Sequence, residues 1–396
     1  MDVFSPKQVN HQPGAPAAGD AAERVISRAD FAEAWDQISA WPGYQPTDLV
    51  TLPGLAARAG IAGLYYKDEG SRFGLGSFKA LGGAYSALRL LQRELHARTG
   101  QEYPLSQISA GQCREACAAI TLVSATDGNH GRSLAWGAQR FGATCRIYIH
   151  AEVSAVRADA IAAFGAEIIR VDGDYDASVA RARDDAEENG WFVVSDTSWP
   201  GYTIPPRDVM AGYGVMAREA AETLGDAPTH VIVQGGVGGY AAAVAAFFRQ
   251  HWGDRTPRVI VVEPDRAACL FASATAGELT NVAIEDETIM AGLSCGEPSP
   301  LAWEVLAEEA WDFLTVPDDF VGPTMRLLAR PEAGDPPIEA GESAVGGVAA
   351  LLAVSADPTL RERLGLGADA RVLIFGTEGV TDPEIYARIM AGADHV

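Results

Sequence analysis

The sequence predicts an α/β protein built on open parallel sheets, and three observations lead to this fold class. Apolar runs of strand length alternate with helical stretches between residues 120 and 195, the order of consecutive β–α units. Loops rich in glycine, or in Asn and Asp, follow several of these runs, at the strand ends where open α/β sheets bind ligands. The 396 residues, 48% of them hydrophobic, are enough for two domains that each bury a core.

The elements can be assigned in order from apolar runs, turn residues and helix-capping residues. Short apolar runs predict strands, at 64–68, 120–124, 145–149, 166–171, 191–195, 230–234, 258–263 and 371–375. Stretches with helical spacing predict helices, at about 22–40, 79–98, 133–141, 154–164, 175–189, 207–224, 240–250, 301–309 and 318–328, with another opening at 342–347. We expect 1–22 to be a flexible N-terminal arm, 23–90 and 206–396 a large domain, and 91–205 a small α/β domain.

Charge and cysteine content exclude several classes of function. The 30 Lys and Arg and 53 Asp and Glu residues give a net charge of −23, which argues against nucleic acid and anionic membranes as partners. The sequence has no run of 18 uncharged apolar residues and no basic segment leading into an apolar one, so we expect neither a membrane span nor a secretion signal. Five cysteines in a chain this long do not make a disulfide framework, and a cytoplasmic location is expected.

Gly235, Gly236, Val237, Gly238 and Gly239 form a loop between a predicted strand and a predicted helix. Glycines let several backbone N–H groups point to one centre, and a helix N-terminus adds a positive dipole end. A tight turn alone would need one or two glycines. The loop therefore predicts a phosphate-binding site.

A dinucleotide site is the alternative at this loop. Residues 236–241 fit the G-x-G-x-x-G/A pattern, and Glu263 ends the next strand, where an acid that binds a ribose is expected. Against this, such a motif usually opens the first βαβ unit of its domain, whereas a series of β–α units precedes it here. A Rossmann oxidoreductase stays open as a second hypothesis.

A second loop, Thr126, Asp127, Gly128, Asn129 and His130, follows the strand at 120–124. Backbone donors at the start of the next helix suit a substrate carboxylate, the Asn129 amide can donate to a phenolate oxygen, and Asp127 is a candidate acid or base. Alone, an Asx-Gly turn is more often structural. Beside the glycine loop it indicates a ligand site, with His130 as a hydrogen-bonding residue rather than a catalyst.

Lysine occurs only three times, at Lys7, Lys67 and Lys79. Lys7 lies in the predicted arm, and Lys67 is expected to hold a surface charge pair with the acids that follow it. Lys79 comes after a glycine-rich turn and begins an apolar helix, where a cation opposes the helix dipole. An amine in that place suits a nucleophile or a base. A solvated turn lysine is the alternative, and the neighbouring loops favour the chemical role.

Three motifs occur in the order Ser77-Phe-Lys79, Gly128-Asn-His-Gly131 and the loop 235–239. This order resembles that of the fold-type II pyridoxal-phosphate (PLP) enzymes, the group of tryptophan synthase β and the serine and threonine dehydratases. Within this group the chain is most similar to the diaminopropionate ammonia-lyase family, on matches that run from about residue 50 to 386. Asp127, where simpler dehydratases have Ser or Gly, is the most specific match. The resemblance implies two open parallel-sheet α/β domains with the cofactor between them.

The resemblance implies a role for each matching residue. Lys79 would carry PLP as a Schiff base and transfer protons, Asp127 would be a second base on the opposite face of the substrate, and Asp196 would lie near the distal amino group. The cofactor-binding residues would be Lys79, Phe78, Asn129 at the 3′-oxygen, the phosphate loop Gly235, Gly236, Val237, Gly238 and Gly239, and Thr377 at the pyridine nitrogen. The substrate-binding residues would be Ser77, Thr126, Asp127, Gly128, His130, Asp196 and Tyr202.

The implied activity is elimination of ammonia from D- or L-2,3-diaminopropionate, which yields pyruvate and two molecules of ammonia. A hydroxyl partner for the pyridine nitrogen suits β-elimination over transamination, and a carboxylate at Asp196 would favour a diamino acid over serine. The chain departs from the family pattern at Gly76, Ser77 and Val380. A lyase acting on a serine-, threonine- or 3-hydroxyaspartate-like amino acid is therefore an alternative, and a non-catalytic PLP-binding protein is a third hypothesis.

The family also implies a homodimer that acts on a small amino acid. Cys269 and Cys295 match positions that can pair in the family, but a disulfide is not expected in a reducing cytosol. Cys113 and Cys117 have no further ligands in sight, so we predict two small buried residues and no metal site.

Overall fold

The computed structural model describes residues 3–17, 19–126, 128–151, 153–173, 175–331 and 334–393. The chain divides into two compact units: the first comprises residues 1–28, 46–77 and 216–396, and the second comprises 29–45 and 78–215. The domain limits expected from the sequence, 1–22, 23–90 with 206–396, and 91–205, lie elsewhere. The difference arises because the helix that begins at Lys79 is continuous to Thr99 and belongs wholly to the second unit.

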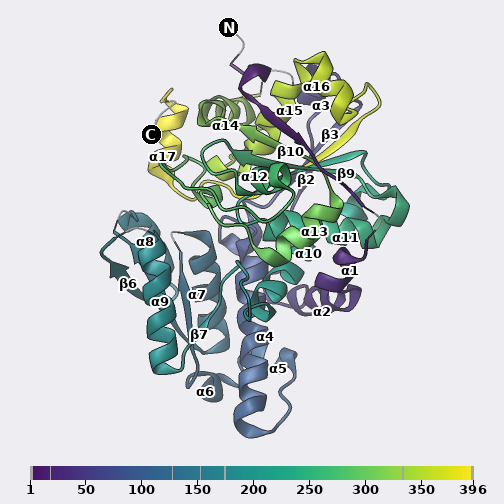
Figure 1. The fold of residues 1–396 in the computed structure, drawn as a ribbon. Helices are drawn as coiled ribbons and strands as arrows, with labels where there is room; N and C mark the ends of the chain where they lie inside the picture. Colours follow the sequence, from purple (N-terminus) through teal and green to yellow (C-terminus); the bar gives the residue numbers. More distant parts are fainter. Residues whose placement is uncertain are drawn as a thin grey trace. The chain divides into compact units, whose positions relative to one another are not determined.

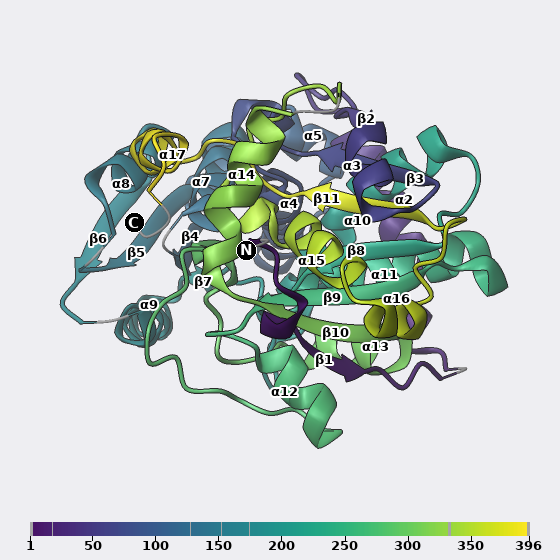
Figure 2. The same ribbon diagram turned by 90° about the horizontal axis from the view of Figure 1, so that it is seen from above.

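The first unit is built on a seven-stranded sheet with the order β1-β10-β9-β8-β11-β3-β2. Its strands are β1 (Asn10–Pro13), β2 (Leu49–Thr51), β3 (Gly63–Asp68), β8 (His230–Gln234), β9 (Arg258–Pro264), β10 (Ala310–Val316) and β11 (Arg371–Gly376). The five central strands pair in parallel, and the two edge strands are antiparallel. Figure 2 shows β8, β9, β10 and β1 side by side. The parallel α/β fold is confirmed, with antiparallel edges that the sequence did not predict.

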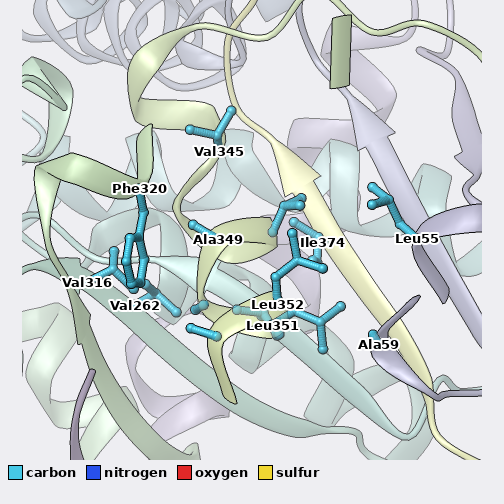
Figure 3. Close-up of a cluster of buried hydrophobic side chains, with 14 of the residues drawn as sticks. Leu55, Ala59, Val262, Val316, Phe320, Val345, Ala349, Leu351, Leu352 and Ile374 are labelled. Carbon is cyan, nitrogen blue, oxygen red and sulfur yellow. The ribbon is translucent and has the colours of Figure 1, made fainter. Parts of the chain in front are cut away.

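Helices pack on this sheet and complete the first unit. They are α1 (Ala21–Val25), α3 (Pro53–Ala59), α11 (Gly239–Trp252), α12 (Cys269–Ala276), α13 (Pro300–Glu309), α14 (Val321–Ala329), α15 (Gly346–Ser355), α16 (Pro358–Leu364) and α17 (Pro383–Met390). Helix α15 is apolar on every side, as expected of a fully buried helix. Figure 3 shows its residues Ala349, Leu351 and Leu352 among core side chains that include Ile374 of β11 and Val262 of β9.

The second unit has a four-stranded, all-parallel sheet with the order β6-β5-β4-β7. Its strands are β4 (Thr121–Ala125), β5 (Thr144–His150), β6 (Glu167–Val171) and β7 (Phe192–Val193), and its helices are α2 (Arg28–Ile38), α4 (Lys79–Thr99), α5 (Leu105–Ser109), α6 (Arg114–Cys117), α7 (Asn129–Phe141), α8 (Ala155–Ala162) and α9 (Tyr175–Asn189). Figure 1 labels α7, α8 and α9 around this sheet. The consecutive β–α units predicted between residues 120 and 195 are present, and residues 99–118, where no element was predicted, hold the short helices α5 and α6.

The N-terminal segment is more ordered than the sequence suggested. Strand β1 pairs with β10, and the predicted helix at 22–40 is two helices, α1 and α2, because Ile26 takes an extended conformation between them. The Gln250 side chain of α11 donates to the carbonyls of Ala22 and Ile26 at 2.9 and 2.7 Å, which satisfies carbonyls at the end of α1. Residues 10–25 therefore belong to the fold of the first unit.

Helix α10 (Ile204–Leu224) begins three residues before the expected start at Arg207. Pro205 and Pro206 lie in its first turn, where the missing N–H groups have no partner within a helix anyway. Residues up to Val215 belong to the second unit, and those from Met216 belong to the first. Within the described ranges, no helix has the length and apolarity needed to cross a membrane.

Candidate active site

The glycine loop lies at the carboxyl end of β8, as predicted. Gly236 and Gly238 have φ values of +91° and +93°, which L side chains rarely adopt, and Gly238 precedes α11. In the described chain, no acceptor is paired with the backbone N–H of residues 236 to 239. Four donors at a helix N-terminus make a site that fits a phosphate group.

The buried side chain of Glu263 packs against this loop. Its carboxylate oxygens accept from the backbone N–H of Leu270 at 3.0 Å and Phe271 at 2.7 Å, at the start of α12. A Cβ placed on Gly235 would lie 2.3 Å from Glu263 Cγ, so glycine is required there. Burial raises the pKa of Glu263 to about 8, although the two N–H groups oppose the shift. Because both oxygens are engaged and buried, Glu263 is not available to bind a ribose, and the dinucleotide hypothesis fails.

The loop after β11 brings Thr377 next to the segment that leads to Lys79. Ser77 forms an antiparallel bridge with Glu378, and the N–H of Gly379 donates to the carbonyl of Gly76 at 2.9 Å. The Thr377 hydroxyl is buried and lies 3.5 Å from the Ser343 carbonyl, the long limit of a hydrogen bond. The ends of β8, β11 and β3, which are neighbours in the sheet, therefore carry the glycine loop, Thr377 and Ser77.

Lys67 corrects one prediction: it is buried, not on the surface. It belongs to a buried ion cluster with Glu69, Arg72 and Glu219, and it also donates to the half-buried Thr47. Lys67 Nζ lies 2.6 Å from Glu219, and Arg72 donates to Glu219 at 2.8 and 2.7 Å. Arg72 also donates to Glu69 at 2.8 and 2.9 Å. In this cluster, two cations pair with two carboxylates. These ion pairs hold the start of the segment that ends at Ser77.

In the second unit, Lys79 begins α4 and its amine meets Asp196. Lys79 Nζ lies 2.6 Å from Asp196 Oδ2, and each side chain is 21% exposed. Lys79 Nζ also lies 5.5 Å above the centre of the Phe78 ring. Burial alone would raise the pKa of Asp196, but Lys79 and then His130 outweigh it and hold the pKa below its usual range. Asp196 is therefore a carboxylate beside an ammonium.

His130 also lies close to Oδ2 of Asp196. Its Nε2 is 2.9 Å from the Val194 carbonyl, which fixes the proton on Nε2, and its Nδ1 lies 3.9 Å from Asp196 Oδ2. Among the described residues, Nδ1 has no hydrogen-bond partner. Burial lowers the pKa of His130, although Asp196 pulls it upward. His130 is therefore a neutral imidazole with an acceptor nitrogen on the Asp196 side.

The remaining predicted residues follow β4 and β7, which are neighbouring strands. Thr126 Oγ1 accepts from the N–H of Gly128 at 3.3 Å, and Asn129 is the half-buried first residue of α7. Asp127 lies outside the described residues. The Tyr202 hydroxyl accepts from the N–H of Ser195 and donates to the Val193 carbonyl, both at 2.9 Å. It therefore shapes the backbone just before Asp196.

Sequence reasoning missed three residues that support this arrangement. Ser133 Oγ donates to the Lys79 carbonyl at 2.7 Å and accepts from the N–H of Ala84 at 3.1 Å, which fixes the first turn of α4 on α7. The Tyr213 ring packs 4.7 Å from that of Phe78, and burial raises the pKa of Tyr213. In the first unit, Gln234 Nε2 donates to the carbonyls of Ala344 and Phe375. Only the spacing of Ser133, four residues after Asn129, could have signalled its place.

Comparisons with known proteins agree with these features. The family model described as "Pyridoxal-phosphate dependent enzyme" matches residues 40–378. The diaminopropionate ammonia-lyase of Escherichia coli (strain K12) is 40% identical over 360 residues, which cover 89% of each chain. A crystal structure of the E. coli diaminopropionate ammonia-lyase in complex with D-serine superposes with a TM-score of 0.88 at 36% identity, covering 98% of each chain.

A further crystal structure of the E. coli enzyme contains an aminoacrylate–PLP azomethine reaction intermediate. It has a TM-score of 0.86 at 36% identity and covers 98% of each chain. In the first unit, the glycine-loop N–H groups suit a phosphate and the buried Thr377 hydroxyl suits a neutral ring nitrogen. In the second unit, the partly exposed Lys79 is an amine of the kind that reacts with an aldehyde. The chain belongs to the pyridoxal-phosphate-dependent enzyme family and, within it, to the diaminopropionate ammonia-lyases.

Proposed function

We propose that the protein is a PLP-dependent lyase that eliminates ammonia from 2,3-diaminopropionate, with pyruvate and two molecules of ammonia as products. The observation that carries this choice of substrate is the contact of 2.6 Å between Lys79 Nζ and Asp196 Oδ2. It places a carboxylate where it binds an alkylammonium ion inside the site. A diamino acid presents such an ion on its side chain, whereas serine and threonine present a neutral hydroxyl.

The cofactor contacts in this proposal come from separate parts of the chain. The N–H groups of residues 236 to 239 bind the phosphate, Thr377 faces the pyridine nitrogen, and Asn129 binds the 3′-oxygen. Phe78 lies beside the Lys79 amine, which would bond to the aldehyde carbon of PLP. When bound, PLP supplies the electron sink for the negative charge that proton removal leaves on Cα.

Substrate contacts come from the loops after β4 and β7. The N–H groups at the start of α7, with Thr126 and Gly128, bind the substrate carboxylate. Asp196 and His130 receive the distal ammonium, and Tyr202 holds the backbone of that loop. Ser77 closes the side of the site that lies next to Lys79 in sequence.

Two bases serve the two enantiomers. Lys79 removes the Cα proton on one face, and Asp127 removes it on the opposite face. The distal amino group leaves as ammonia from its protonated form, so no separate acid has to protonate it. The released aminoacrylate then hydrolyses in water to pyruvate and the second ammonia. The enzyme works in the cytoplasm, which its cysteine content favours, and as a homodimer, which the family resemblance implies.

The test is the ratio of ammonia to pyruvate across a panel of amino acids. D- and L-2,3-diaminopropionate should each give two ammonia per pyruvate. Serine, threonine and 3-hydroxyaspartate should turn over far more slowly. Faster turnover of a hydroxy amino acid, with one ammonia per keto acid, would assign the dehydratase alternative instead. Tightly bound PLP with no ammonia from any substrate would identify a non-catalytic binding protein.

A further inference from the structure

Asp196 Oδ2 and His130 Nδ1 form an acceptor pair, which we call the ammonium site. The two atoms are 3.9 Å apart, and Lys79 Nζ lies 2.6 Å from Asp196 Oδ2. His130 is neutral, so it accepts from an ammonium without repelling it. In the part of the chain that the structure describes, Lys79 is the cation paired with Asp196.

The roles that Lys79 must fill conflict with its place in this site. As a base, Lys79 needs an unprotonated amine, because an ammonium cannot accept the Cα proton. A carboxylate at 2.6 Å favours the ammonium form. A free Lys79 amine that returns to Asp196 is therefore held as a cation and is inactive as a base.

Asp196 lacks a paired cation whenever Lys79 is not beside it. A carboxylate that is four-fifths buried is costly without a cation or donors. His130 cannot supply the charge, because burial lowers its pKa and its proton faces the Val194 carbonyl. Tyr213, the other titratable group close to Lys79, is a neutral phenol with its pKa raised by burial. Asp127 lies outside the described residues and would add a negative charge.

We propose, on the basis of the function given above, that Lys79 and the distal ammonium of a diamino acid compete for the ammonium site. When the substrate fills the site, Asp196 no longer holds Lys79 as an ammonium, so the neutral amine that accepts the Cα proton is more populated. A hydroxy amino acid cannot fill the site, so Lys79 returns to Asp196 as an ammonium. The substrate thus activates its own base, and specificity arises from proton placement as well as from binding.

The elimination balances in this scheme. The Cα–H bond breaks and an N–H bond forms on Lys79, while the electron pair of the Cα–H bond becomes the Cα=Cβ π bond. The Cβ–N bond breaks and its electron pair leaves with nitrogen, so the β-ammonium departs as neutral ammonia. The positive charge has passed from the substrate to Lys79. Lys79 then takes up the emptied ammonium site, and Asp196 faces one cation before and after the step.

The site can be examined directly because the chain has only three lysines. In cofactor-free protein labelled with [13Cε]lysine, three resonances are expected, and Lys79→Arg identifies that of Lys79. The titration midpoint of Lys79 should fall by about one to three pH units in Asp196→Asn. Addition of 2,3-diaminopropionate to wild-type protein should shift the Lys79 resonance toward that of the free amine, and serine should not. The matched control is Asp208→Asn, which breaks a pair with Arg93 of 2.7 Å elsewhere in the same unit.

Kinetics of the PLP-loaded enzyme give an independent readout. In Asp196→Asn, kcat/KM for 2,3-diaminopropionate should fall at least about tenfold, whereas kcat for the serine enantiomer whose Cα proton Lys79 removes should rise, because Lys79 is no longer held as an ammonium. Asp208→Asn should affect both substrates in the same direction. An equal fall for both substrates in Asp196→Asn, or an unchanged Lys79 midpoint, would overturn the competition.

Failure of the proposed function gives a different pattern from failure of this inference. If wild-type enzyme makes no ammonia from diaminopropionate, the function is wrong, whatever the lysine resonances show. If wild-type enzyme makes ammonia but diaminopropionate leaves the Lys79 resonance of the cofactor-free protein unmoved at saturating concentration, the competition is wrong and the function stands.

Discussion

Removing Glu219 tests the buried ion cluster that anchors the segment before Lys79. Glu219 accepts from Lys67 at 2.6 Å, from Arg72 at 2.8 and 2.7 Å, and from the N–H of Thr47 at 3.2 Å. In Glu219→Ala, two buried cations would face the single carboxylate of Glu69. Leaving one buried charge uncompensated costs about 3–5 kcal/mol, so we expect Glu219→Ala to lower the free energy of unfolding by that amount.

A neighbouring glutamate on the same helix provides the control. Glu222 is half exposed and pairs with Arg218 one turn away, and such surface pairs contribute about 0.3–0.5 kcal/mol. Glu222→Ala has the same change in helix propensity but should cost less than about 1 kcal/mol. The double variant Lys67→Ala/Glu219→Ala removes one charge of each sign, so it should cost less than the sum of the two single variants.

The assay is urea denaturation at pH 7, followed by both circular dichroism and tryptophan fluorescence. Burial alone would raise the pKa of Glu219, but Arg72 and Lys67 hold it below the usual value. The stabilisation is therefore fully present above the ordinary glutamate pKa of about 4.3 and is lost only as the pH falls through the lowered folded-state value. Equal destabilisation by Glu219→Ala and Glu222→Ala would refute the reasoning.

Three further predictions concern the site. The pKa of Glu263 is raised from 4.5 to about 8, so wild-type protein should lose stability as the pH rises through this interval. Glu263→Gln should show a smaller loss when Tm is measured at pH 5.5 and 8.5. Equal losses in the two proteins would contradict the supporting role of Glu263. Gly235→Ala would place a Cβ 2.3 Å from Glu263 Cγ and should weaken PLP binding about tenfold, whereas Gly277→Ala, with no atom within 4 Å, should leave the PLP Kd unchanged. Asp127→Asn should reduce turnover of one enantiomer of diaminopropionate more than the other, and equal reductions would count against two bases.

Short-range motifs made the ligand loops predictable. The glycines after β8 and the Asn-His turn after β4 carry their signal within a few residues, and parallel strands bring such loops to one edge of each sheet. Lys79 was recognisable because the chain has so few lysines and because it begins an apolar helix. These features made Lys79 and the glycine loop candidates from the sequence alone, whereas Asp196 was implied only by the family resemblance.

Features that depend on partners far away in the sequence were not predictable. Lys67 looked like a surface residue because its neighbours are acidic, but its buried partner Glu219 lies 152 residues away. Asp312 interrupts the apolar run of β10, so this strand was missed. The Asp312 side chain forms a hydrogen bond of 2.7 Å with His11, which lies 301 residues away on β1. A local pattern cannot show that a charged residue will find a partner after folding.

Residues that support the site without belonging to a motif were also not recognisable in the sequence. Ser133 and Gln234 act through hydrogen bonds to backbone carbonyls, which any polar residue of suitable length could make. Tyr213 looks like an ordinary apolar position of α10. Its relation to Phe78 and Lys79 follows only from the packing of the helices.

The central claim is that Lys79 carries the cofactor, and one measurement tests it most directly. The holoenzyme is reduced with borohydride, digested, and analysed by mass spectrometry for the pyridoxyl group. Lys67, buried with carboxylate partners, and Lys7 serve as internal controls. The label is expected on Lys79 alone, with loss of the visible absorbance band, and Lys79→Ala should show no band. A label on Lys67 or Lys7, or no label on protein that retains PLP, would contradict it.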